Sequence, residues 1–331
     1  MINSVGPHWE GNQVWLVTAI GALFAAWPIV YAMAFSGFYL AMMIILFALF
    51  LRPLAFDYRS KVDNVHWRST MDKGLFLGST IPPLMFGIIF GNLFIGLPFH
   101  FDEFMRPYYT GNAAALFNPF AILVSVLTLN LITMHGATWL QMRTLDSLES
   151  RSRLVAKVSA VSLLVLFISA VLWLYVGIDG YVITHMPDAN SSFMPTVKEV
   201  SHQAGAWFAN YQTYPWTKLI PLSGLLGCIF VFIAAHYDRS GWAFVSSSLS
   251  IIGIIGSAVT ALFPFIMPSS SQLGHSLTMW DATSSLMTLK IMFWIAAFFV
   301  PIIVSYTFWT YSKMWRRLDN HFIRSNTHSS Y

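Results

Sequence analysis

Long uncharged runs alternate with short charged loops along this chain. The hydrocarbon core of a bilayer is about 30 Å thick and needs about 20 apolar residues as helix, because every backbone group there must bond within its own segment. The runs that meet or approach this length are Ile29–Leu51, Gly74–Leu97, Ala113–Met134, Val158–Ile178, Leu219–Ala235, Trp242–Met267 and Ile291–Ser312. This pattern predicts an all-α, polytopic membrane protein with about seven transmembrane helices.

The first run has an apolar extension on its N-terminal side. Residues 11–51 contain no Asp, Glu, Lys or Arg. One straight helix over these residues would be about 60 Å long, roughly twice the hydrocarbon thickness, and Pro28 is the natural break. We expect Gln13–Trp27 to lie at the interface, partly embedded, and to lead into the span at Ile29. A tight hairpin of two short spans is the alternative.

Lysine and arginine gather in alternate loops. The loops Arg52–Lys73, Thr144–Lys157 and His236–Gly241, with Arg143 and the tail from Lys313, hold 14 of the 18 basic residues. Cytoplasmic loops carry this excess, so the C-terminus is predicted in the cytoplasm and the N-terminus, seven spans away, in the periplasm. The chain is then a single integral-membrane domain, with a periplasmic or interfacial lead-in (1–28), seven spans (29–312) and a cytoplasmic tail (313–331).

Composition agrees with a membrane protein and excludes several other classes. The chain is 56% hydrophobic and only 10% charged, whereas a soluble domain carries about 25% charged residues. The basic residues are not gathered on one face, so no nucleic-acid partner is expected. The single cysteine, Cys228, cannot form an internal disulfide. Charged residues are absent from the middle of every span, which disfavours an autonomous transporter without excluding one.

The densest polar group beside an apolar helix is the stretch from Pro7 to Trp15. Glu10 falls where the positive end of the helix dipole favours a carboxylate. A capping glutamate at the membrane surface is the simpler interpretation, and a proton-carrying group is the functional one. Trp15 is either a membrane anchor or a packing contact with a partner subunit. The weaker candidates, whose side chains could hold water or line a proton path, are His8, Trp9, Asn12 and Gln13.

Two further residues have structural interpretations. Asp281 precedes the last run and is expected to cap its helix. His135 is the histidine closest to the middle of a span. A polar contact at a helix end is the favoured role, and haem ligation, which needs a side chain facing a bundle interior, is the alternative. We expect this chain to hold no metal or cofactor by itself.

Short stretches spread over the whole chain carry a family resemblance. They are Gly11–Leu16, Gly21–Pro28, Ala34–Tyr39, Arg52-Pro53, Phe56–Arg59, Tyr109–Asn112, Gly136–Thr138, Leu140–Thr144, Gly177–Tyr181, Phe263–Phe265, Met267–Pro268-Ser269-Ser270 and Ser276–Ser285. Together they resemble subunit II of the cytochrome bd-type ubiquinol oxidases.

The resemblance implies a heterodimeric complex of the bacterial inner membrane that oxidises quinol, reduces dioxygen to water and generates a proton motive force. Its partner is subunit I, which is expected to ligate haems b558, b595 and d, and a small accessory subunit can join them. Subunit II is implied to support subunit I and to help supply protons and dioxygen. Glu10 then lies on a proton route, and Trp15 lies close to the proton and oxygen routes.

The family architecture pairs two four-helix bundles, and the usual first helix has no counterpart in this sequence. The first bundle is therefore expected to be one helix short. The alternatives to an oxidase subunit are a secondary transporter and an inserted but inactive fragment of the subunit.

Overall fold

Seven helices in the computed structural model are long and apolar enough to cross a membrane, counted over the described residues 1–186 and 194–313. They are α4 (Tyr39–Tyr58), α5 (Val65–Ile95), α6 (Pro119–Arg143), α7 (Asp146–Gly177), α9 (Leu219–His236), α10 (Ser240–Leu262) and α11 (Leu286–Lys313). The prediction of an all-α, polytopic membrane protein is confirmed.

The helix ends differ from the ends of the apolar runs for local reasons. α5 begins in a charged loop, where the Asn64 side chain caps it by accepting hydrogen bonds from the backbone of His66 and Trp67. α6 begins at Pro119 because Asn118 caps it, while the preceding residues form the 3-10 turn η1 (Ala113–Phe117). α10 ends at Leu262, two residues before Pro264, which cannot donate a helical hydrogen bond.

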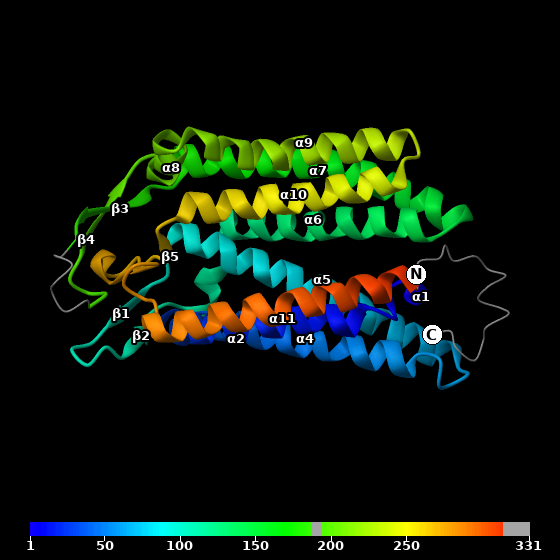
Figure 1. Cartoon of the computed structure of the whole chain (residues 1–331), viewed down its shortest axis with the longest axis horizontal. Helices are drawn as coiled ribbons and strands as arrows, with labels where there is room; N and C mark the ends of the chain where they lie inside the picture. The colour runs from blue at the N-terminus through cyan, green and yellow to red at the C-terminus, as the bar shows by residue number, and fades with distance from the viewer. Residues whose placement is uncertain (187–193, 314–331) are drawn as a thin grey trace.

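Helices α6, α7, α9 and α10 form a four-helix bundle, drawn in green and yellow in Figure 1. Small residues let the backbones approach, as is usual where lipid gives no hydrophobic drive between helices. A Cβ atom on Gly253 of α10 would lie 2.2 Å from the backbone nitrogen of Gly224 on α9. Between α6 and α7, Asn130 Nδ2 donates to the Ser159 carbonyl and to Ser162 Oγ, both at 2.9 Å.

The other group contains α2 (Trp9–Ala26), α4, α5 and α11, and the short α3 (Pro28–Gly37) joins α2 to α4 (Figure 1). The expected span Ile29–Leu51 is thus divided at Phe38 between α3 and α4. Pro28 starts α3, as predicted for the break, and α2 runs the length of the molecule. At one end of α2 the Ala26 carbonyl accepts from the Ser284 backbone, and at the other Asn12 Nδ2 donates to Tyr311 Oη.

The predicted position of the N-terminus is wrong relative to the C-terminal helix. α1 (Ile2–Val5) and the start of α2 lie at the same end of the molecule as the end of α11 (Figure 1). The His8 ring stacks on Tyr311 with centroids 3.8 Å apart. Residues 1–28 are therefore not an interfacial lead-in on the opposite side, and the hairpin alternative is nearer to the structure. Residues 314–331 of the expected tail lie outside the described part of the chain.

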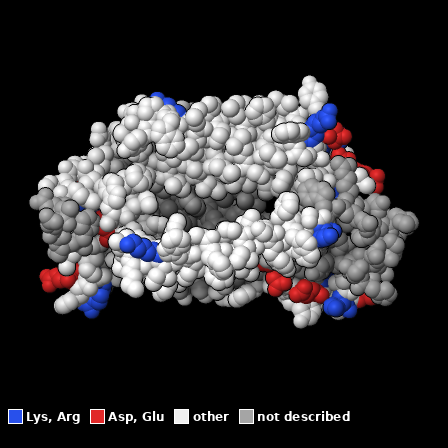
Figure 2. Space-filling view, in the orientation of Figure 1, with Lys and Arg blue, Asp and Glu red and all other residues white. Residues whose placement is uncertain are grey.

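The opposite end carries short antiparallel hairpins, which we call the strand cap. Its described strands pair β1 (Phe99–Phe101) with β2 (Pro107–Tyr109), β3 (Gly180–His185) with β4 (Glu199–Gln203), and β5 (Phe265–Met267) with β6 (Leu277–Thr278). Between them lie η2 (Ala206–Phe208), α8 (Ala209–Thr213), η3 (Pro215–Lys218) and η4 (Leu273–His275). Figure 2 shows the charged side chains at the two ends of the molecule, with an uncharged belt between them. That distribution fits a bilayer around the belt.

Candidate functional site

The polar stretch that the sequence singles out lies at the start of α2, where the helix divides it between different faces. His8 and Asn12, one turn apart, face α11: the His8 ring stacks on Tyr311, and Asn12 Nδ2 donates to Tyr311 Oη at 3.0 Å. Burial lowers the pKa of His8, and the positive charge of Arg143 lowers it further. His8 is therefore a neutral, stacked ring at neutral pH.

Trp9 and Gln13 face α4. The Trp9 ring stacks on Phe56 with centroids 4.9 Å apart, and the Arg52 guanidinium lies 6.0 Å from the Trp9 ring centroid. Gln13 is half-buried, and its Oε1 is buried without a hydrogen-bond partner among the described residues. A buried amide oxygen of this kind is a place where water binds.

Of the two leading candidates, Glu10 points away from the rest of the chain, whereas Trp15 lies on the same side of α2 as Asn12, one turn further along. Glu10 is exposed and begins a stripe along α2 that continues through Val14, Val17 and Phe24, which are 57%, 65% and 58% exposed. Trp15 is 39% exposed. The structure therefore does not bring Glu10 together with His8 and Asn12, and the predicted constellation is split into an inward and an outward half.

A cavity of about 750 Å³ lies behind the inward half, between the two groups of helices. The polar side chains that line it include His8, Asn12, Arg52, Ser79, His135, Trp139 and Tyr311. Arg52 was expected only as a basic residue of a loop, and nothing in the hydrophobic pattern pointed to Tyr311. Their place in this cavity depends on α2 crossing the molecule.

His135 lies within α6 and makes a polar contact with a side chain of another helix, where the sequence favoured a contact at a helix end. Its Nδ1 lies 2.8 Å from Ser247 Oγ on α10, its ring stacks on Phe244, and Thr138 Oγ1 lies 3.0 Å from the same serine oxygen. No cluster of three His, Cys, Asp or Glu side chains occurs among the described residues. These contacts pack His135 between α6 and α10.

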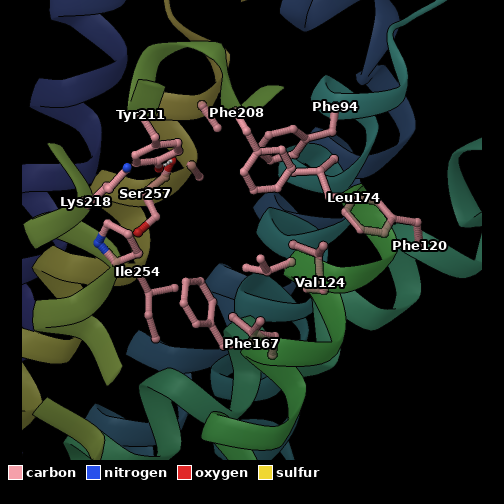
Figure 3. Close-up of a pocket in the computed structure, with 16 residues that line it drawn as sticks. Phe94, Phe120, Val124, Phe167, Leu174, Phe208, Tyr211, Lys218, Ile254 and Ser257 are labelled. Atoms are coloured by element: carbon pink, nitrogen blue, oxygen red, sulfur yellow. Dashed lines mark hydrogen bonds between the residues drawn. The ribbon is translucent and has the colours of Figure 1, made fainter. Parts of the chain in front are cut away.

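A second cavity, of about 350 Å³, lies inside the four-helix bundle near the strand cap. Figure 3 shows the rings of Phe94, Phe120 and Phe167 turned towards this space, with Tyr211 and Lys218 at its edge. Tyr211 Oη donates to the Ser257 carbonyl at 2.8 Å, and burial raises the pKa of Tyr211 to about 12. The lining is almost entirely hydrocarbon, which suits a small apolar molecule better than water.

The expected role of Asp281 as the cap of the last helix is wrong. α11 begins at Leu286, and Ser285 Oγ accepts from the Thr288 backbone at its start. Asp281 lies in the strand cap, where Oδ1 accepts from the Thr278 backbone at 2.8 Å and Oδ2 pairs with Lys198 Nζ at 2.6 Å. The sequence could not show this pair, because Lys198 comes from a different loop.

The fold and the site together define a multi-pass helical membrane protein with polar groups at the ends of its helices and two internal cavities. The model of the cytochrome bd terminal oxidase subunit II family matches residues 1–314. The chain belongs to this family. It is therefore a subunit of a quinol oxidase complex that contains haem, with subunit I as its partner.

Individual relatives agree with this assignment. The chain is 51% identical over 331 residues to cytochrome bd-I ubiquinol oxidase subunit 2 of Escherichia coli (strain K12), covering 100% of this chain and 87% of that protein. It is 30% identical over 326 residues to cytochrome bd ubiquinol oxidase subunit 2 of Bacillus subtilis (strain 168), with 97% and 85% covered. A chain of the bd oxidase from Geobacillus thermodenitrificans shares the fold, with a TM-score of 0.65 at 13% identity, over 95% of this chain and 84% of that one.

Proposed function

We propose that this chain supports subunit I of the oxidase and guides protons and dioxygen towards it. Haems b558, b595 and d would be ligated by subunit I and would supply the electron transfer and oxygen reduction, with quinol and dioxygen as the substrates of the complex. A small accessory subunit fits the same scheme. The complex lies in the bacterial inner membrane, and the basic loops put the end of α11 in the cytoplasm. The N-terminus then lies on the cytoplasmic side as well.

The exposed position of Glu10 carries the proton part of the proposal. A carboxylate at the end of an apolar stripe is unfavourable against lipid, and ionisable groups in such places commonly serve ion or proton pathways. No residue of α11, which lies beside α2, is buried within this chain. Both helices thus offer surface to a partner, and docking of subunit I would enclose Glu10 and Trp15 rather than leave them to lipid.

Glu10 would act by carrying a proton, in a step that uses only its carboxylate. The group takes a proton from the aqueous phase at the end where α2 begins and passes it to water or to an acceptor on the partner. Gln13 Oε1, buried without a partner among the described residues, can hold water one turn along α2. A glutamine at position 10 keeps the shape of the side chain but cannot carry a proton.

The test is oxygen consumption and proton uptake by the purified complex in lipid vesicles. Glu10→Gln should slow both by at least about tenfold, since a positioned proton carrier typically contributes about 10²–10⁴-fold, while Glu10→Asp should retain most of the rate. Glu103→Gln, an exposed carboxylate of the strand cap, is the control. Unchanged turnover and charge movement in Glu10→Gln would remove Glu10 from the path. Recovery of this chain without a haem-bearing partner would contradict the complex itself.

The cavity inside the four-helix bundle supports the oxygen part. Dioxygen is small and apolar, and cavities lined by hydrocarbon bind such molecules while staying dry. Val171 lines this cavity, and Val165 lies on the outer side of the same helix with 60% exposure. Val171→Phe should raise the KM for dioxygen and leave kcat unchanged, whereas the matched Val165→Phe should change neither. Equal KM values in the two variants would exclude this cavity from oxygen supply.

A further inference from the structure

The strand cap contains a histidine whose ring nitrogen holds two of its segments together. His275, in η4, accepts a hydrogen bond at Nδ1 from the backbone N–H of Phe101 in β1, at 2.9 Å. The neighbouring Phe99 carbonyl accepts from the hydroxyls of Ser269 and Ser271, each at 2.5 Å. The serine contacts do not titrate in the physiological range, so the contact at Phe101 is the one that depends on pH.

The direction of this hydrogen bond fixes the charge of the ring. A neutral imidazole has one nitrogen that donates and one that accepts, and in the imidazolium both nitrogens donate. Nδ1 of His275 accepts from Phe101, so the ring is neutral here. Adding a proton to Nδ1 would set two N–H groups against each other and break the contact.

The surroundings of His275 oppose a positive charge. Burial lowers the pKa of His275, and His100 on β1 and the Lys198 ammonium lower it further. The nearby carboxylate of Asp281 does not offset this, because it already pairs with Lys198 and accepts from the Thr278 backbone.

The remaining titratable groups on the elements that pack against η4 are accounted for. On β4, His202 packs edge-on against Tyr181 with ring centroids 4.5 Å apart, and Glu199 is exposed. On β2, Tyr108 stacks on His100. In the β1–β2 turn, Asp102 pairs with Arg106 and Glu103 is exposed. The charges that act on His275 are those of His100 and Lys198, and both oppose a proton on its ring.

We propose that His275 is a pH-sensitive latch, which fastens β1 to η4 while it is neutral and releases the tip of the β1–β2 hairpin when mild acid protonates it. The latch holds above the ordinary pKa of histidine, about 6.5. It weakens as the pH falls below that value, because the unlatched ring binds a proton more readily than the latched one. The contact between His275 and Phe101 lies within this chain, so the latch works in the same way whatever the function of the complex.

Hydrogen exchange on the intact complex tests this, with mass spectrometry of peptides from β1 and, as a reference, from β3, between pH 7.5 and 5.0. After correction for intrinsic exchange, protection at Phe101 should fall by up to about tenfold for each pH unit below the pKa of the released ring, about 6.5, while β3 stays protected. In His275→Asn the amide oxygen can accept from Phe101 but does not titrate, so protection should be retained and independent of pH. His100→Asn removes a side chain whose charge lowers the pKa of latched His275, so the fall in protection should become smaller.

A fall of the same size in His275→Asn would overturn the latch, as would a flat profile in the wild-type protein. Equal loss of protection in β1 and β3 would also overturn it, because that result reports general acid unfolding of the strand cap. If His275→Asn lost β3 protection at neutral pH, the wild-type profile and the smaller fall in His100→Asn would decide the question, and an equal fall in those two proteins would then overturn the latch.

Discussion

Removing the charge of Asp281 should destabilise the strand cap strongly. The Lys198 and Asp281 side chains are 1% and 3% exposed, and their charged atoms are 2.6 Å apart. Asp281→Asn keeps the oxygen that accepts from the Thr278 backbone and removes only the negative charge. Lys198 then keeps its hydrogen bond to the Pro195 carbonyl at 2.5 Å but loses its counter-ion in a buried site.

The magnitude follows from the burial of both partners. Breaking a buried ion pair on one side costs about 3–5 kcal/mol, because the remaining charge stays desolvated. For cooperative unfolding of a chain of 331 residues, with an unfolding entropy of about 2.1 cal/mol/K per residue, this corresponds to a fall of roughly 4–7 °C in apparent Tm. Burial lowers the pKa of Lys198 while Asp281 opposes that shift. Without Asp281 the lysine should lose its proton more readily, and the destabilisation should therefore shrink as the pH is raised.

The assay is thermal denaturation of the purified complex at one scan rate, read as apparent Tm. Lys198→Met combined with Asp281→Asn removes both charges and should recover most of the loss, since an apolar replacement of a buried pair is often close to neutral. The control is Asp102→Asn, which acts on the exposed pair with Arg106 and should change Tm little. An Asp281→Asn protein as stable as the wild type, or a double variant as unstable as the single one, would refute the reasoning.

Two further predictions concern the helix packing and the start of α2. Gly253→Ala places a methyl group 2.2 Å from the Gly224 backbone nitrogen. It should lower the free energy of unfolding by about 1–3 kcal/mol and so lower the apparent Tm of the complex. The control is Gly136→Ala, which has open space around its Cβ atom and should not lower the apparent Tm. His8→Phe keeps the stack on Tyr311 and removes the titration. Burial and Arg143 lower the pKa of His8, so its contribution to stability is complete above about pH 6.5 and is lost below it. The wild-type Tm should therefore fall relative to His8→Phe between pH 7.5 and 5.5, and an unchanged difference would contradict this.

The membrane helices could be predicted from the sequence because the bilayer imposes one simple requirement. A span needs about 20 apolar residues, and a run of that length is visible without knowledge of its neighbours. α2 was missed as a pass through the molecule because Glu10, Asn12 and Gln13 make its first turns polar. The error then carried over to the position of the N-terminus, since one missed helix reverses the side on which a chain begins.

The strand cap could not be predicted from the same kind of pattern. Its strands are two to six residues long, too short to show a period in hydrophobicity. Their positions depend on contacts between distant loops, such as the pair of Lys198 with Asp281 and the bond between His275 and Phe101. Asp281 looked like a helix cap because an acidic residue before an apolar run usually is one. Its actual partner is specified only by the folded chain.

The residues of the proposed proton site at the start of α2 could be found from the sequence. Their arrangement around the helix could not. Successive residues of an α-helix are rotated by about 100°, so neighbours in a polar stretch face different directions. The contacts with Tyr311 turn His8 and Asn12 towards α11, and this rotation leaves Glu10 on the opposite side of α2. A proton route through Glu10 therefore cannot be closed by this chain alone. Its next group has to come from water or from the partner subunit, which is why Glu10→Gln must be tested in the assembled oxidase.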